Sequence, residues 1–222
     1  MASLESDERN IIEAEEINWR LIVYPILAIA VLLLGGFGIY YYQLNQREQA
    51  EEQAQAALST AKTPADMAKV ADQFPDTTQA SVALMRAADL SFTQKDYATA
   101  LKDYQSVIDA KQSPQELRDS AQLGLASTQE ASGKADDAIQ TYLIVAHKGN
   151  HSAFAPVAFH QVAAIYASRQ DKTNETQILQ QTVQLGGNSP FVKEAADQLK
   201  QLAPASAPTG TGGTSSNVAP TP

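Results

Sequence analysis

Two segments of the sequence, 38 residues apart, carry the same pattern of side chains. KDYATALKDY begins at Lys95, and GKADDAIQTY begins at Gly133. Each has alanine at its sixth position, a branched aliphatic residue at its seventh and tyrosine at its tenth. Apolar residues three and four positions apart lie on one face of a helix. Self-similarity at a fixed spacing of this size predicts stacked helical repeats.

Each repeat carries a second small residue, twelve positions before the shared alanine. Small side chains let two helices approach closely, and an aromatic side chain four positions on can fill the space beside them. The pattern therefore predicts a pair of antiparallel helices in each repeat, joined at Lys95–Asp96 and Gly133–Lys134. The matching residues are Ala88, Ala100 and Tyr104 in one repeat and Ala126, Ala138 and Tyr142 in the other.

Capping signals predict where other helices of the body begin. Thr63-Pro64-Ala65-Asp66 supplies an N-cap, a proline at the first helical position and an acid three residues after the cap. Ser113-Pro114-Gln115-Glu116 has the same form and predicts a helix that runs to about Ser132. Ser189-Pro190 predicts a final helix that closes the stack, with Phe191, Ala195, Leu199 and Leu202 on one face.

A third, degenerate pair is predicted over residues 156–168 and 174–185. A spacing of 38 residues places Thr176 where the alanine would be, with no aromatic residue four positions later.

Residues 21–42 form an uncharged apolar segment, LIVYPILAIAVLLLGGFGIYYY. As a helix it would be about 33 Å long, enough for a hydrocarbon core of about 30 Å. The charged residues before it are six acids and two arginines, and no small-residue cleavage site follows it, which argues against a cleaved signal peptide. Helix-forming residues continue after it, so the predicted membrane helix extends outward.

The sequence thus predicts an all-α chain in four parts. Charge does not orient it, because two basic residues flank each side of the span: Arg9 and Arg20 before it, Arg47 and Lys62 after it. The tail has no charge and many Pro, Gly, Ser and Thr residues, which predicts disorder. The predicted parts are a short acidic segment (1–20), a transmembrane helix (21–42), a repeat domain of helix pairs (43–203) and the tail (204–222).

This plan resembles the YfgM-like family, membrane-anchored ancillary subunits of the SecYEG translocon with tetratricopeptide-like repeats. Residues 66–109 carry the resemblance most clearly, within an overall plan that covers about 10–203. The chain lacks the tryptophan and glycine of the standard repeat, and its long tail departs from the family. The resemblance implies a single-pass protein of the bacterial inner membrane with a periplasmic body, which links the translocon to periplasmic chaperones.

No catalytic or metal-binding pattern stands out in the sequence. A net charge of −9, from 25 acidic and 16 basic residues, argues against nucleic-acid binding. His147 and His151 have helical metal-site spacing, but Gly149-Asn150 between them should break the helix. No phosphate-binding loop follows a strand. We therefore expect no enzyme, no cofactor and no small-molecule substrate.

The remaining candidate site is the inner face that stacked helix pairs present, lined by the first helix of each pair. Its apolar, methionine-bearing and acidic character would suit a peptide or partner helix. The predicted groove residues are Val82, Met85, Asp89, Phe92, Leu123, Ser127 and Glu130.

Three functions remain open at this point. The first is a membrane-anchored adaptor that binds protein partners through its body. The second is a structural subunit of a membrane complex, held mainly through its transmembrane helix. The third is an enzyme whose active site leaves no recognisable pattern.

Overall fold

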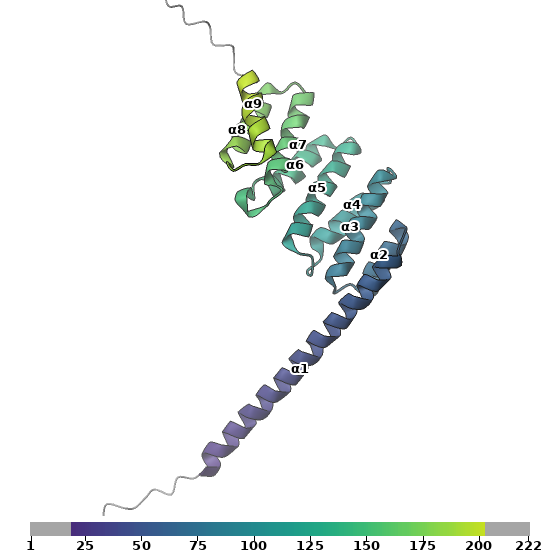
Figure 1. The fold of residues 1–222 in the computed structure, drawn as a ribbon, viewed down its shortest axis with the longest axis vertical. Helices are drawn as coiled ribbons and strands as arrows, with labels where there is room; N and C mark the ends of the chain where they lie inside the picture. Colours follow the sequence, from purple (N-terminus) through teal and green to yellow (C-terminus); the bar gives the residue numbers. More distant parts are fainter. Residues whose placement is uncertain (1–18, 203–222) are drawn as a thin grey trace, which may run out of the picture. The chain divides into compact units, whose positions relative to one another are not determined.

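Every element in the computed structural model, which describes residues 19–202, is helical (Figure 1). No strand occurs in this range, so the predicted all-α class is confirmed. The predicted acidic segment, up to residue 18, and the predicted tail lie outside the described residues. The elements are α1 (Trp19–Thr60), α2 (Pro64–Gln73), α3 (Thr78–Thr93), α4 (Tyr97–Asp109), α5 (Gln115–Ala131), α6 (Ala135–Ala146), the 3-10 helix η1 (Gly149–His151), α7 (Ala155–Ser168), α8 (Lys172–Gln184) and α9 (Pro190–Leu202).

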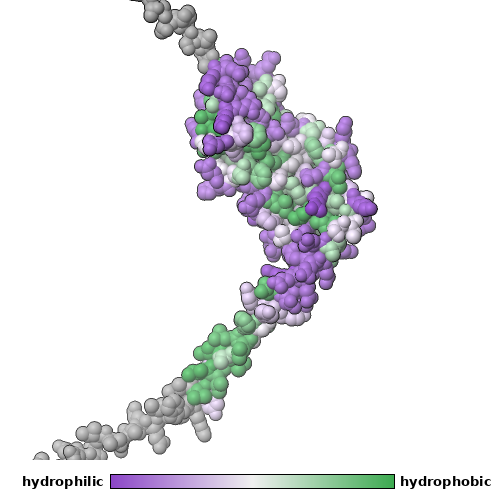
Figure 2. Space-filling view, viewed as in Figure 1, coloured by the Kyte–Doolittle hydropathy of each residue, from purple (hydrophilic) through white to green (hydrophobic). Residues whose placement is uncertain are grey.

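The chain divides into two compact units, with the boundary between Glu52 and Gln53, inside α1. The first unit is the long N-terminal part of this 42-residue helix. Its large apolar side chains from Val23 to Leu44 are exposed, and Figure 2 shows a hydrophobic stretch along this helix. Among the described helices, α1 is the one long and apolar enough to cross a membrane.

The second unit begins with the last turns of α1, which bury one stripe of small and aliphatic residues. Ala54 and Leu58 are buried, and Leu58 packs with Met67 and Val70 of α2. The predicted alanine-rich helix after the apolar segment is therefore present as the continuation of α1. Leu58 is the largest buried side chain of this stripe, and it belongs to the core over α2 and α3.

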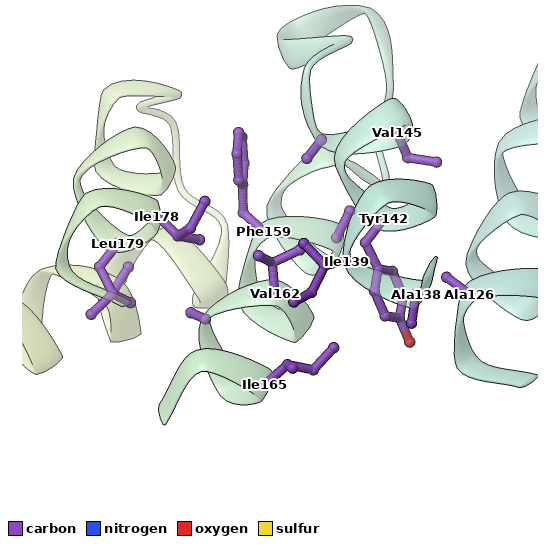
Figure 3. Packing of buried hydrophobic residues seen from close by; sticks show 14 residues of the cluster. Ala126, Ala138, Ile139, Tyr142, Val145, Phe159, Val162, Ile165, Ile178 and Leu179 are labelled. Carbon is purple, nitrogen blue, oxygen red and sulfur yellow. The ribbon is translucent and has the colours of Figure 1, made fainter. Parts of the chain in front are cut away.

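Three helix pairs follow one another along the second unit: α3 with α4, α5 with α6, and α7 with α8. We call them the first, second and third pairs. The alanines predicted to lie at the crossings, Ala88 with Ala100 and Ala126 with Ala138, have no exposed surface. Figure 3 shows Ala126 and Ala138 beside the ring of Tyr142, between α5 and α6. The predicted repeat is therefore confirmed.

The turn inside each pair places one residue in the left-handed region of backbone space. These residues are Lys95, Gly133 and Gln170, with φ values of 62°, 84° and 58°. The third pair therefore follows the second after 37 residues, not 38. This corrects the predicted register by one position: Glu175, not Thr176, corresponds to Ala138, and Leu179 corresponds to Tyr142.

Only one of the two predicted capping boxes forms. At α2, the Thr63 hydroxyl accepts a hydrogen bond from the Asp66 amide at 3.1 Å, and the Asp66 carboxylate accepts from the Thr63 amide at 3.3 Å. At α5 the prediction is wrong, because Pro114 is the N-cap and no side chain caps the helix. The Ser113 hydroxyl is instead buried without a hydrogen-bond partner.

The last helix, α9, covers the third pair as predicted. Leu199 and Leu202 are partly buried and pack against the large core cluster that runs from α5 to α9. Ala195 is buried, and so is Val192, which the prediction did not include. Val192 lies three residues before Ala195, so the buried stripe of α9 is wider than the predicted one.

Candidate interaction surface

The seven predicted groove residues lie on the first helices of the first two pairs. Val82, Met85, Asp89 and Phe92 are on α3, and Leu123, Ser127 and Glu130 are on α5. Asp89 and Glu130 are exposed, and the other five are partly buried. Most of the predicted groove residues therefore expose only part of their surface, and the rest of it is buried.

The four apolar candidates contact three different core clusters. Met85 and Phe92 pack against the cluster of the first pair, which contains Tyr104 and Val107. Val82 packs against the cluster of α1, α2 and α3. Leu123 packs against the cluster that extends from α5 to α9. Of the four apolar candidates, only Met85 and Phe92 therefore pack against the same cluster.

Phe92 also contacts an aromatic residue of the following helix. The centroids of the Phe92 and Tyr97 rings are 5.9 Å apart, with a tilt of 54°. Tilted aromatic pairs at this distance are favourable beyond their buried area. The contact holds Phe92 at the end of α3, partly accessible and partly packed.

The polar candidate on α3 accepts a hydrogen bond from the tyrosine of its own pair. The Tyr104 hydroxyl donates to Asp89 Oδ1 at 2.6 Å. Burial raises the pKa of Tyr104, and the hydrogen bond to Asp89 and its negative charge raise it further. Tyr104 therefore stays neutral and acts as a donor.

The second pair repeats this arrangement with a serine. The Tyr142 hydroxyl lies 2.8 Å from Ser127 Oγ and donates to Glu130 Oε2 at 3.4 Å. Burial raises the pKa of Tyr142 to about 12, against the opposing effect of the hydrogen bond with Ser127. The three polar candidates thus surround two tyrosine hydroxyls. Asp89 and Ser127 stand at equivalent repeat positions, a spacing visible in the sequence that our prediction did not use.

A glycine that the sequence analysis overlooked lets α5 cross the ring of Tyr104. A Cβ atom on Gly124 would lie 2.4 Å from two atoms of that ring. Real Cβ atoms do not approach other atoms so closely, so the junction between the first and second pairs requires glycine here. The sequence around Gly124 gives no sign of this contact with Tyr104.

A buried ion pair joins the second pair to the segment before the third. Asp119 of α5 is buried, and its carboxylate accepts hydrogen bonds from Lys148 and, at 2.6 Å, from Gln115. Burial acts to raise the pKa of Asp119, but the hydrogen bonds from Lys148, Ser152 and Gln115 outweigh it and hold this pKa below its ordinary value. Asp119 is therefore ionised at neutral pH, and its bond with Lys148 links α5 to the region of η1.

The histidines do not form a shared site. His147 follows the last residue of α6, and η1 separates it from the start of α7, so the predicted helix break is present. The His147 ring lies edge-on to Phe159, with centroids 5.8 Å apart. Across residues 19–202, no group of three His, Asp or Glu side chains is arranged to hold a metal ion.

Stacked helix pairs with buried alanines at their crossings are the architecture of a helical repeat protein. The comparison with known families agrees: residues 16–158 match the family described as "Tetratricopeptide repeat-like domain". The match covers more than half of the chain, which therefore belongs to the tetratricopeptide repeat-like domain family. No curated protein matches the chain. Members of such repeat families typically bind other proteins and are typically not catalytic.

Proposed function

We propose that this protein is a non-enzymatic adaptor, anchored in a membrane by α1, that binds protein partners through its repeat domain. The carrying observation is that one uninterrupted helix includes both an exposed apolar segment and the first buried turns of the repeat unit. In the proposed domain plan, residues 21–42 cross the membrane and residues 43–203 form the binding domain, between the segments 1–20 and 204–222.

The surface of α1 supports the anchor. Leu32, Leu33 and Leu34 are 75%, 68% and 71% exposed, although leucine is ordinarily a buried residue. A contiguous apolar surface of this size is rare on proteins that work in water. A lipid bilayer would cover it, and its length suits the thickness of the hydrocarbon core.

The inner face of the repeats supports protein binding. Met85 and Phe92 are two turns apart on α3 and both pack against the cluster of the first pair, and the exposed residue Asp89 lies between them in the sequence. Partly exposed aromatic and methionine side chains are typical anchors of interfaces, and an acidic neighbour restricts which partners fit. We propose that Val82, Leu123, Ser127 and Glu130 extend this contact surface.

At a finer level, we propose a YfgM-like role: an ancillary subunit that links the SecYEG translocon, or another inner-membrane complex, to periplasmic folding factors. The tetratricopeptide-like family and the candidate membrane helix support this assignment, together with the resemblance in residues 66–109. On this proposal the body lies in the periplasm, and the partners are translocon subunits and chaperones.

A second candidate function is a structural subunit held mainly through its transmembrane helix. The observation that favours it is that most of the predicted groove residues are partly buried and contribute to the core. If their exposed parts bind nothing, α1 is the remaining interaction surface.

Protease protection tests the anchor and its orientation. Protease added to spheroplasts should digest the body and leave a small membrane-bound fragment that contains α1. The matched control is the same treatment after the membrane has been dissolved, which should give the same digestion of the body. A body that is protected until the membrane is dissolved would place it in the cytoplasm.

Partner capture distinguishes the two functions. The full chain and the fragment 43–203 should capture the same partners from gently solubilised membranes, identified by mass spectrometry. Phe92→Ala should weaken capture at least about tenfold, because loss of a central aromatic anchor can cost 2 kcal/mol or more. The control is Ile144→Ala, which removes an exposed aliphatic side chain from α6, outside the predicted groove.

The same experiment can contradict the adaptor. If Phe92→Ala lowers helix content, Phe92 is part of the core and not of the binding surface. If the fragment captures nothing that the full chain captures, the transmembrane helix carries the interaction and the structural-subunit function replaces the adaptor.

A further inference from the structure

One buried carboxylate in α4 lacks the partners that such a group normally has. Asp103 is only 5% exposed, and no group in residues 19–202 forms a hydrogen bond or an ion pair with its carboxylate, whose oxygen atoms are not fully buried and line a cavity. Asp119, which is similarly buried, has Lys148 and Gln115 as donors. Because a buried charge without partners is costly, the position of Asp103 requires a reason.

Asp103 lines a cavity of about 290 Å³ between α2, α3 and α4. We call this cavity the α2–α4 pocket. Leu84, Ala71 and other alanines form the apolar walls, while oxygen atoms come from Asp103, Asp72 and Ser106. None of the seven predicted groove residues lines it, so it is separate from the surface proposed above.

The electrostatic environment of the pocket is negative. Burial raises the pKa of Asp103; the charge of Lys102 lowers it, and the charges of Asp96 and Asp72 raise it. Lys102 also lines the pocket, but its side chain is exposed and forms no ion pair with Asp103 in the described structure. A cation from outside the chain would therefore find a carboxylate that Lys102 influences through space but that has no direct ion pair in the described structure.

The lining selects an organic cation over a metal ion. A hard metal ion takes six or more oxygen ligands, whereas no group of three acidic or histidine side chains in residues 19–202 could hold one. An arginine side chain matches both features of the lining: its aliphatic stem can contact the alanine and leucine walls. Its planar guanidinium has five N–H donors for several acceptors.

We propose that the α2–α4 pocket binds the guanidinium group of an arginine side chain from a partner protein, with Asp103 as its main acceptor and Asp72 as the second. This inference goes beyond the adaptor function, because it adds a contact site on a different surface. Binding in the α2–α4 pocket would depend on charge, whereas the groove around Phe92 would anchor apolar side chains.

A peptide titration of the full-length chain tests the proposal. The probe is acetyl-Gly-Gly-Arg-Gly-Gly-amide, and the matched control probe has citrulline, a neutral isostere, in place of arginine. Binding is followed by the backbone amide shifts of α2 and α4 in nuclear magnetic resonance spectra. We expect saturable shifts around Asp103 with the arginine peptide and at least about tenfold weaker binding of the citrulline peptide.

Three substitutions separate the pocket from general charge attraction. Asp103→Asn should weaken arginine binding at least about tenfold, and Asp72→Asn should weaken it less. Asp109→Asn removes the same charge from an exposed position of α4, outside the pocket, and should leave binding unchanged. In the absence of peptide, Asp103→Asn should melt at the same or a higher temperature, because it removes an unpaired buried charge.

Each contrary outcome overturns the proposal. Equal binding of the two peptides would show that charge is not recognised. A similar loss for Asp109→Asn would show general electrostatic attraction only. A lower melting temperature for Asp103→Asn would make the carboxylate a structural group. Displacement of the peptide by Mg²⁺ or Ca²⁺ at low concentration would make this an inorganic cation site. A failure of the pocket to bind arginine would say nothing about the groove around Phe92, so each of the two proposals can fail without the other.

Discussion

The first two helix pairs and the third solve the same packing problem with different side chains. In the first two, alanines meet at the crossing and a buried tyrosine fills the space beside them, with its hydroxyl bonded to the partner helix. In the third, Ala163 faces a helix that carries Glu175 and Leu179. Leu179 is as deeply buried as the tyrosines but has no polar group. Volume at this position is therefore required, whereas the hydrogen bond across the pair is optional.

The turns inside the pairs show a second difference. In the first and third pairs the left-handed residue is not glycine, and an aspartate caps the following helix: Asp96 accepts from the Thr99 amide, and Asp171 accepts from the Asn174 amide. In the second pair Gly133 takes the left-handed conformation without strain, but Lys134 provides no cap. The first and third turns therefore gain a capping aspartate but place a non-glycine residue in the left-handed region. The second turn avoids that cost but lacks the cap.

The largest effect is expected at the ion pair of Asp119 and Lys148, which joins the second pair to the segment before the third. Asp119→Ala leaves Lys148 partly buried without its partner and should cost about 3 kcal/mol of unfolding free energy. Asp136→Ala is the control, because it breaks an exposed ion pair with Arg169 and should cost about 0–1 kcal/mol. Urea unfolding followed by circular dichroism measures both, and equal effects would show that burial does not matter here.

The same ion pair predicts how stability depends on pH. The pKa of Asp119 is lowered in the folded state, so the group binds a proton more readily when the chain is unfolded. Its stabilisation is complete above the unfolded pKa of about 3.9 and is lost as the pH falls through the lower folded value. Melting temperatures of wild type and Asp119→Ala should therefore begin to converge below about pH 4 and meet below the folded pKa of Asp119.

Placing leucine at the two equivalent positions tests the comparison of the pairs, because leucine is much larger than alanine but similar in volume to glutamate. Ala138→Leu should overpack the fully buried crossing of the second pair and cost about 1–3 kcal/mol. Glu175→Leu, at the equivalent and only partly buried position of the third pair, should change stability by less than about 0.5 kcal/mol. Equal tolerance would mean that the corrected register of the third pair is wrong.

Gly124→Ala tests the contact between the first and second pairs. In a free helix the change would stabilise by about 0.5–1 kcal/mol. Here the new Cβ would meet the Tyr104 ring, so we expect a net loss of about 1–2 kcal/mol in urea unfolding. Tyr104→Leu in the same chain should remove most of that loss, since it removes the ring. Additive effects would contradict the contact.

The smallest expected effect concerns the turn of the second pair. Lys134→Asp would give α6 the aspartate cap that α4 and α8 have, and should add about 0.5–1 kcal/mol of stability. The control is Lys134→Ala, which removes the charge without adding a cap. A gain of the same size from both would attribute the effect to charge, and thermal melting distinguishes them.

Sequence patterns alone determined the helical class, the apolar span and the pairing of Ala88 with Ala100 and Ala126 with Ala138. These features depend on residue type at short spacing, which periodicity reports directly. The capping box at Thr63 was equally local, because donor and acceptor are three residues apart.

Only the tertiary structure decided the contacts made across long separations. Nothing near Ser113 in the sequence shows that its hydroxyl is buried and that Pro114 takes the cap position. The left-handed turn at Gln170 shifts the third pair by one residue, and a non-glycine residue there gives no signal. Gly124 against Tyr104, Lys148 on Asp119 and the burial of Asp103 each depend on how neighbouring helices pack. Packing joins residues by position in space, and a periodic pattern records only which face of its own helix a residue occupies.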